Sequence, residues 1–352
     1  MPDESPTPAL QPPAGIGIVG LGFMGATHLK AFQRIAGCRI VALCNPSGRN
    51  LDGDFSNTVG NVGSTEPLRL DMTRVQAYRD YAAFLADPAV RLVDICSPTH
   101  THPELAIAAL KAGKHVLCEK PLARTSKLAR DIAVAAAGAG PFLMPAMCLR
   151  FSPEWTWIQS AIQRRPYGRC LAARFRRVGQ PPAWGQKFFF NGDLSGGALL
   201  DLHIHDADFV QFCFGRPRSV FSAGFSKVSG AIDHVVTQYQ VDSGAAVSAE
   251  GSWAMADGFG FQMSYTVVFE GATADYDSTR AGDALRLFEN GRDPQTLKFE
   301  GVDGYVGELQ YMLDCIRAGK PPSLVTAADG ISAIEICEAE ERSVKSGAMV
   351  PV

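Results

Sequence analysis

The chain has 352 residues, too many for one ordinary core, so two domains are expected. Hydrophobic residues at 46% and charged residues at 20% are normal for a globular protein and exclude disorder of the whole chain. A formal net charge of -3 offers no broad basic field, so we expect a small-molecule partner and neither nucleic acid nor membrane.

The N-terminal segment and the cysteines indicate the compartment. Residues 1–14 are rich in proline and carry acids where a signal peptide needs positive charge and an apolar stretch, so we expect a disordered leader. The sequence has no run of the roughly 18 apolar residues that span a membrane. Nine cysteines stand singly without a C-x-x-C pair, which argues against a zinc cluster or a disulfide framework and favours a cytoplasmic protein.

Strands and helices are predicted to alternate through the first part of the chain. In chain order the expected elements are strand 16–20, helix 26–35, strand 39–44, helix 78–86, strand 92–96, helix 102–112, strand 114–118, helix 126–137 and strand 142–146. This order predicts a doubly wound parallel sheet with helices on both faces, a Rossmann domain over residues 15–147. The long connection 45–70 is of a length that tends to be functional or mobile.

Beyond about residue 150 the pattern changes. The expected elements are one long helix 197–214, strands 217–228, 232–241, 244–253 and 262–277, and a last helix 327–346. Tight polar turns between the strands predict antiparallel pairing. We therefore expect residues 148–352 to form an α+β domain with a large open, mainly antiparallel sheet, covered in a homodimer or homotetramer.

A glycine-rich turn stands between the first strand and the first helix. Its letters are G-L-G-F-M-G, with Gly20, Gly22 and Gly25 around Phe23 and Met24. The first glycine permits a tight turn, the second lets the backbone approach a pyrophosphate, and the third lets helix and strand pack closely. The pattern predicts a dinucleotide site; a turn that only packs is the alternative.

The end of the second strand bears on cofactor choice. An acidic residue here would bind the ribose hydroxyls, but the sequence has Asn45, followed by Ser47 and Arg49. Without a carboxylate a 2′-phosphate is not repelled, and Arg49 could pair with it. NADP is therefore at least as plausible as NAD, unless Arg49 is simply solvated in the loop.

Candidate catalytic groups occur in two places. Glu119 and Lys120 end a buried parallel strand, where α/β sheets place their ligands, and Pro121 restricts the backbone after them. The Lys120 ammonium could stabilise a developing alkoxide. Asp201 and His205 are spaced i, i+4 on the predicted helix, so the carboxylate could orient an imidazole that takes a proton. A loop lysine, a capping aspartate and a surface histidine are the alternatives.

A metal site is not expected. His203 and His205 would lie about 200° apart on a helix, so they could not bind one ion together. His100 and His102 lie in a loop, but neither a carboxylate nor a cysteine cluster accompanies them.

Five motifs together resemble the Gfo/Idh/MocA oxidoreductase family. They are G-L-G-F-M-G, S-P-T-H-T-H (97–102), A-G-K-H-V-L-C-E-K-P (112–121), L-R-F-S-P (149–153) and S-G-G-A-L-L-D-L-H-I-H-D-A-D (195–208). The resemblance implies that Lys120, Asp201 and His205 are catalytic and bind substrate. It also implies cofactor contacts from Ser97, Pro98, Thr99, His102 and Glu119.

Three more residues are expected at the substrate, and three features depart from the family pattern. Arg150, Trp184 and Lys187 are our candidates for substrate contacts. Asn45 replaces a common acid, the following loop is longer, and His203 stands where a small residue is more usual. These departures leave the cofactor and the substrate open.

The resemblance implies an NAD(P)-dependent oxidoreductase. Hydride would pass between the nicotinamide and a secondary alcohol or ketone of a sugar, polyol or derivative. Two alternatives share the fold: a glycoside hydrolase that uses transient oxidation and elimination, and a non-catalytic NAD(P) or sugar sensor.

Overall fold

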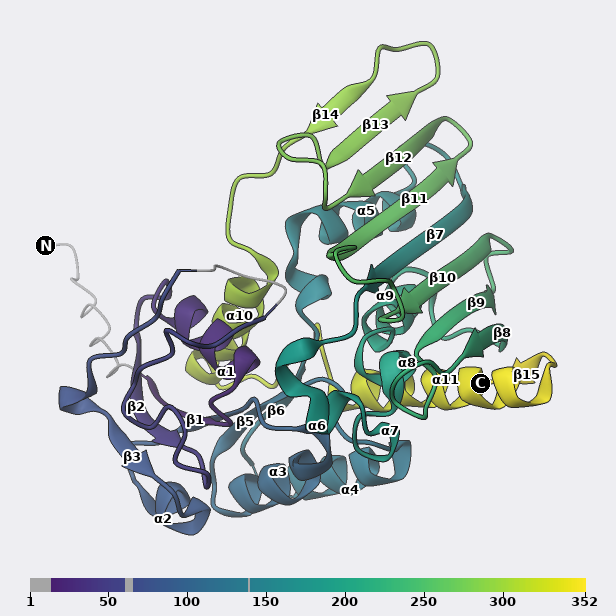
Figure 1. Ribbon diagram of the computed structural model, residues 1–352. Coiled ribbons are helices and arrows are strands. Elements are labelled where there is room, and N and C mark those ends of the chain that lie inside the picture. The colour runs from purple at the N-terminus through teal and green to yellow at the C-terminus, as the bar shows by residue number, and fades with distance from the viewer. Residues whose placement is uncertain (1–13, 61–65, 139) are drawn as a thin grey trace, which may run out of the picture.

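The computed structural model describes residues 14–60, 66–138 and 140–352. The predicted leader lies outside the described residues except for Ala14, which begins the first strand instead. Two sheets organise the described chain, with helices around the first and along one face of the second (Figure 1). None of the helices described is long and apolar enough to cross a membrane.

The first sheet has six strands in the order β3-β2-β1-β4-β5-β6, and its neighbours pair in parallel. The strands are β1 (Ala14–Val19), β2 (Cys38–Cys44), β3 (Gln76–Tyr78), β4 (Leu92–Ile95), β5 (His115–Glu119) and β6 (Leu143–Ala146). The strand order reverses between β1 and β4, which confirms the predicted doubly wound fold. Short, exposed β3 was not predicted, because three residues at a sheet edge carry little apolar pattern.

Four helices connect these strands: α1 (Phe23–Phe32), α2 (Tyr81–Ala86), α3 (His102–Lys111) and α4 (Ser126–Ala137). Their starts follow from local chemistry. Asp80 accepts a hydrogen bond from the Ala83 amide at the start of α2, and Thr125 accepts one from the Leu128 amide at the start of α4. These caps set the residues at which α2 and α4 begin. α4 has the predicted bounds.

The second sheet has nine strands in the order β14-β13-β12-β11-β7-β10-β9-β8-β15. They are β7 (Cys170–Gly179), β8 (Ser219–Phe225), β9 (His234–Gln240), β10 (Ala246–Ser252), β11 (Phe261–Phe269), β12 (Ala272–Asp277), β13 (Leu285–Glu289), β14 (Gln295–Leu297) and β15 (Val350–Pro351). β7 pairs with β10 in parallel, and the other described neighbours pair antiparallel, as predicted. The single strand expected at 262–277 is wrong: the chain turns back at Glu270 and Gly271, and β11 and β12 form a hairpin.

The helices of this part are α5 (Pro153–Arg164), α6 (Gln186–Phe189), α7 (Gly192–Ser195), α8 (Gly197–Asp201), α9 (Ile204–Phe214), α10 (Gly304–Ala318) and α11 (Ala327–Ser346). α5, α9 and α11 lie on the same side of the second sheet (Figure 1). α10 packs against α1 and α11 against α4, so the C-terminal helices return to the first sheet. α11 begins at a capping box formed by Thr326 and Asp329 and has the predicted bounds.

The long helix predicted at 197–214 is broken into α8 and α9 at Leu202 and His203. The His203 ring is buried at this break. Its Nε2 lies 3.0 Å from the Tyr239 hydroxyl and 3.2 Å from a Glu340 carboxylate oxygen. The polar ring at the break is thus held by β9 and α11.

Candidate active site

A cavity of about 1090 Å³ opens between the two sheets at the carboxyl ends of β1, β2, β4 and β5. Open α/β sheets bind ligands at this edge, where the strand order reverses. The volume exceeds the roughly 300–1,000 Å³ of pockets for one drug-sized ligand, so a cofactor and a substrate can lie in it together. Met263 of the second sheet and Trp253, in the segment that follows one of its strands, also line the cavity.

The glycine turn forms one end of the cavity. Gly20 has φ +88°, and a Cβ there would come within 2.5 Å of the Ser97 amide nitrogen. A Cβ at Gly25 would lie 2.2 Å from the Gly20 carbonyl oxygen, so this glycine allows α1 to pack on the strand. A Cβ at Gly22 would meet no described atom within 4 Å, and Gly22 lines the cavity. The turn thus has open space where a pyrophosphate is expected.

Phe23 and Met24, at the start of α1, also line the cavity. The unpaired amides of the first helical turn face this end, and a helix N-terminus favours an anionic group. The residues of the turn therefore fit a dinucleotide.

Asn45, Ser47 and Arg49 line the cavity at the end of β2. The Asn45 side chain organises this corner: its Nδ2 donates to the Arg49 carbonyl at 2.8 Å, and its Oδ1 accepts from the Ser47 hydroxyl at 3.0 Å. The described residues lining this corner include no carboxylate. Asn50 then donates to the Leu21 carbonyl at 2.8 Å, which ties the long loop back to the glycine turn.

Ser97, Pro98 and Thr99, after β4, line the cavity, whereas His102 does not. The buried His102 ring lies behind that lining, with Nε2 2.8 Å from the Ser97 carbonyl oxygen and Nδ1 2.9 Å from the Pro121 carbonyl oxygen. The expected cofactor contact from His102 is therefore corrected. Its ring instead joins the loops that follow β4 and β5.

Lys120 follows β5 and reaches the second part of the chain. Its Nζ donates to the Asp201 carbonyl at 2.5 Å and lies 3.8 Å from an Asp201 carboxylate oxygen. In a continuous helix that carbonyl would bond the amide four residues later, but the break after α8 leaves it free for the ammonium. The helix break thus brings Lys120 and Asp201 together.

His205 also lines the cavity, from the first turn of α9. Within residues 197–214, all described, no hydrogen bond joins its ring to Asp201, so the i, i+4 contact predicted from a continuous helix is wrong. Burial first, and then the cations Lys120 and Arg177, hold the pKa of His205 well below its usual range. Burial raises the pKa of Asp201, while Lys120 opposes the rise. At neutral pH His205 is therefore an uncharged base.

Of the three candidate substrate contacts, only Trp184 lines the cavity, with its ring edge-on to Phe23 at a centroid distance of 5.8 Å. Lys187 is exposed on α6 and is not part of the lining. Arg150 is buried elsewhere, bound to Asp208 at 2.7 and 2.9 Å and to Asp329 at 3.2 Å. The expectations for Lys187 and Arg150 are therefore corrected: Arg150 joins the segment after β6 to α9 and the start of α11.

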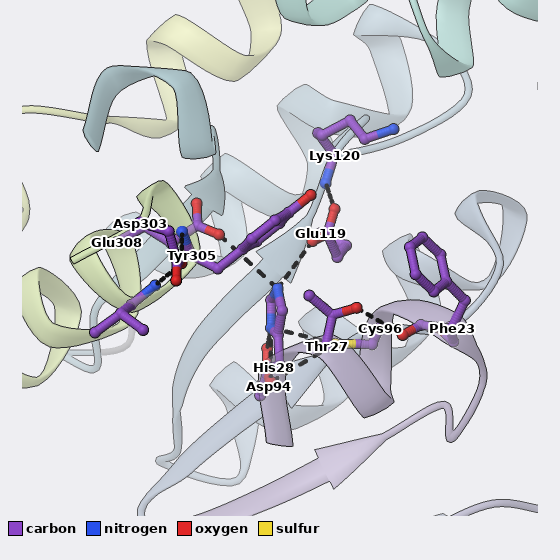
Figure 2. A network of polar contacts seen from close by, with 12 residues as sticks. Phe23, Thr27, His28, Asp94, Cys96, Glu119, Lys120, Asp303, Tyr305 and Glu308 are labelled. Carbon is purple, nitrogen blue, oxygen red and sulfur yellow. Dashed lines mark hydrogen bonds and ion pairs between the residues drawn. The ribbon is translucent and has the colours of Figure 1, made fainter. Parts of the chain in front are cut away.

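Sequence reasoning missed a buried polar cluster beneath Glu119. It contains His28 of α1, Asp94 and Cys96 of the β4 segment, and Glu308 of α10 (Figure 2). Two overlapping groups, His28 with Asp94 and Cys96 and His28 with Glu119 and Glu308, hold ligand-type atoms within 4.8 Å of one another. A lone histidine on the buried face of α1 was the only sequence signal.

Aromatic side chains form much of the remaining wall. Phe188, Phe189 and Trp253 line the cavity, and Phe189 packs edge-on to Trp184 and Trp253 at centroid distances of 6.2 and 5.7 Å. This wall lines the same cavity as Lys120 and His205.

The chain matches two family models in order. Residues 14–147 match the oxidoreductase family with an NAD-binding Rossmann fold, and residues 155–275 match the GFO/IDH/MocA C-terminal domain. Similar solved structures include levoglucosan dehydrogenase with NADH and levoglucosan, at TM-score 0.81, 21% identity and coverage of 96% of this chain and 99% of that one. Aldose-aldose oxidoreductase from Caulobacter crescentus has TM-score 0.82 and 21% identity, covering 96% and 99%.

The curated relatives are named as dehydrogenases and reductases, which supports neither the hydrolase nor the sensor. Inositol 2-dehydrogenase 4 of Saccharopolyspora erythraea is 27% identical, covering 96% of this chain and 95% of the relative. 1,5-Anhydro-D-fructose reductase of Ensifer adhaerens is 40% identical over 56% of this chain and 55% of its own. The motifs, the fold and both family models agree, and the chain belongs to the Gfo/Idh/MocA family of NAD-binding oxidoreductases.

Proposed function

We propose that the protein transfers hydride between a nicotinamide cofactor and a secondary alcohol or ketone of a sugar, polyol or derivative. The supporting observation is that Lys120 and the pair Asp201 and His205, which begins 81 residues later, line one cavity that also contains the glycine turn. We assign cofactor binding to residues 15–147 and substrate binding and assembly to residues 148–352. The bound nicotinamide supplies the hydride acceptor or donor.

The chain supplies the proton chemistry. His205, uncharged at neutral pH, takes the hydroxyl proton at a ring nitrogen during oxidation and returns it during reduction. The Lys120 ammonium stabilises the substrate oxygen as negative charge develops on it. Asp201 orients that ammonium through its carbonyl oxygen and its carboxylate. In this proposal Asp201 acts on Lys120 rather than on the imidazole.

The cofactor lies along the edge of the first sheet in this proposal. Gly20, Gly22, Phe23 and Met24 surround the pyrophosphate, with Gly25 packing behind them. The nicotinamide end lies near the lining residues Ser97, Pro98, Thr99 and Glu119. His102 supports that end from behind through its two carbonyl contacts.

We propose that Arg49 lets the site accept NADP at least as well as NAD. Asn45 and Ser47 offer hydrogen bonds without the negative charge that would repel a 2′-phosphate, and Arg49 is exposed beside them. Calorimetry with both cofactors tests this proposal. Arg49→Gln should weaken NADP binding about tenfold and leave NAD binding nearly unchanged. A clear preference of the unmodified protein for NAD would reject the role of Arg49.

The substrate class rests on the wall and on the relatives. Apolar ring faces beside a few polar groups suit a carbohydrate, whose ring carries C–H groups on its faces and hydroxyls at its edge. Inositols, 1,5-anhydro-D-fructose and levoglucosan appear in the names of similar proteins and form the first panel of compounds to screen. The readout is the change in nicotinamide absorbance.

Lys120→Ala tests the catalytic assignment. Turnover should fall by about two to four orders of magnitude, while calorimetry shows cofactor binding retained. The matched control is Lys187→Ala, because Lys187 is an exposed lysine outside the cavity lining. Near-normal turnover of Lys120→Ala, or an equal loss in the control, would contradict the assignment.

We also propose a homodimer or homotetramer through the exposed face of the second sheet, in the cytoplasm. Large apolar side chains are exposed on β8 and β9, at Phe221, Phe225 and Val236. Contact with a second copy of the chain would remove this apolar surface from water. The cytoplasmic location is supported separately by the nine cysteines, which are all free, as expected in a reducing compartment. Light scattering of Phe225→Glu against the unmodified protein tests the interface: an unchanged molar mass would reject it.

A further inference from the structure

Four ionisable side chains from different elements meet beneath the cavity. His28 lies on α1, Asp94 on β4, Glu119 at the end of β5 and Glu308 on α10, and all four are buried. The His28 Nδ1 lies 2.9 Å from an Asp94 oxygen, and its Nε2 lies 3.0 Å from a Glu119 oxygen and 3.8 Å from a Glu308 oxygen. Figure 2 shows the imidazole between the carboxylates.

The arrangement favours a charged imidazole. A neutral ring has one nitrogen without hydrogen, and its lone pair would face a carboxylate oxygen from either Asp94 or Glu119. With both nitrogens protonated, a positively charged ring lies 2.9 Å from Asp94 and 3.0 Å from Glu119. Burial lowers the pKa of His28, but the charges and hydrogen bonds of Asp94 and Cys96 together raise it well above its usual value.

Glu308 differs from the other two carboxyl groups. No described residue hydrogen bonds to either of its oxygens, and burial raises its pKa well above the usual range. A neutral acid satisfies these conditions better than a third anion. The other titratable groups facing His28 are the Cys96 thiol, 3.4 Å from Nδ1, and the Tyr305 ring, 6.2 Å away between centroids.

Glu119 is fixed through both oxygens. Oε1 faces His28, while Oε2 accepts the Lys120 backbone N–H at 3.0 Å. The Lys120 ammonium itself is turned toward the Asp201 carbonyl. Glu119 lines the cavity, so a buried carboxylate with a set orientation faces the ligand space.

We propose that His28 is a positioning residue that keeps Glu119 anionic at the cavity floor, and that this anion makes the site bind the oxidised cofactor more tightly than the reduced one. The inference rests on the proposed function, which puts the nicotinamide near Glu119. The nicotinamide ring carries a positive charge when oxidised and none when reduced. A fixed anion nearby therefore stabilises the oxidised form selectively.

The charge of His28 is tested without cofactor. The full chain is labelled with ¹⁵N-histidine, and the ring nitrogens are followed by NMR from pH 5 to 9. The chain has seven histidines. The His28 signals are assigned by elimination, with glutamine variants of the other six. We expect His28 to show imidazolium shifts at pH 7. A neutral ring at pH 7, or a metal ion bound at Nε2, would overturn the inference.

The effect on cofactor binding is tested by calorimetry with the oxidised and reduced forms. Glu119→Gln should lower the preference for the oxidised form about tenfold, the scale of one screened unit charge. Glu308→Gln is the matched control: it replaces a neutral acid by an amide of similar shape and should leave the preference unchanged. Thermal unfolding checks that both variants fold.

The outcomes separate this inference from the proposed function. An unmodified protein that binds neither form would refute both the cofactor assignment and the preference. Binding of both forms, with a preference in Glu119→Gln within about twofold of the unmodified protein, would refute only the role of Glu119. An equal shift in Glu308→Gln would also refute it, because the effect would not follow the charge.

Discussion

Replacing Gly22 by valine should separate cofactor binding from folding. A Cβ at this position meets no described atom within 4 Å, and the φ of −88° suits any residue, so the fold has room for the side chain. The same space is where the turn should bring backbone amides to a pyrophosphate. A side chain there prevents the close approach, and each lost hydrogen bond to a charged group is worth about 1.5–3 kcal/mol. We expect the Kd for the dinucleotide to rise about tenfold to a hundredfold.

Gly25→Ala is the control for this prediction. Its Cβ would lie 2.2 Å from the Gly20 carbonyl oxygen, so α1 must shift from the strand, at a cost of about 1–3 kcal/mol of stability. Calorimetry gives Kd for each variant, and chemical denaturation gives the free energy of unfolding. Gly22→Val should lose affinity with stability nearly unchanged, whereas Gly25→Ala should lose stability. If Gly22→Val binds the dinucleotide like the unmodified protein, the pyrophosphate does not lie at this turn.

Three further predictions concern the cavity and its surroundings. Arg150→Met should lower the free energy of unfolding by about 3–5 kcal/mol, because the Asp208 carboxylate is left buried without its partner. The substrate KM should stay unchanged. Unchanged stability together with a raised KM would restore Arg150 as a substrate contact. Lys120→Met should raise the pKa of His205 in an NMR titration, because a nearby cation disfavours the protonated ring; a lower pKa would contradict the electrostatics. Trp184→Ala should raise the substrate KM about three- to tenfold in steady-state kinetics, and a change confined to cofactor Kd would place the ring at the cofactor instead.

The first sheet was predictable because its signals are local. Each buried strand is a short apolar run, each helix carries a cap or a stop, and the strict alternation leaves one sheet topology. For the second sheet, the mainly antiparallel pairing was predicted but the order of the strands was not. β7 pairs with β10 and β11, which come more than sixty residues later in the chain, and nothing within β7 itself specifies those partners.

The candidate site was predicted as a set of positions but not as a set of contacts. Motifs report which residues follow a strand or start a helix, so Lys120, Asp201 and His205 were found. They do not report the path of the backbone between such residues. The helical spacing of Asp201 and His205 predicted a direct pair, yet Lys120 bonds the Asp201 carbonyl that the helix break sets free. The His28 cluster was missed for the same reason, since its members come from four separate elements.

The break between α8 and α9 contains His203, a buried residue outside the catalytic set. The structure accommodates the buried His203 side chain at two places. Glu340 and Tyr239 satisfy its Nε2, and Gly251 leaves the space for its ring, since a Cβ there would lie 2.5 Å from the His203 Cβ. The histidine, its two partners and the glycine therefore act as one unit. The unit lies at the break that follows α8, where the Asp201 carbonyl accepts the hydrogen bond from the Lys120 ammonium.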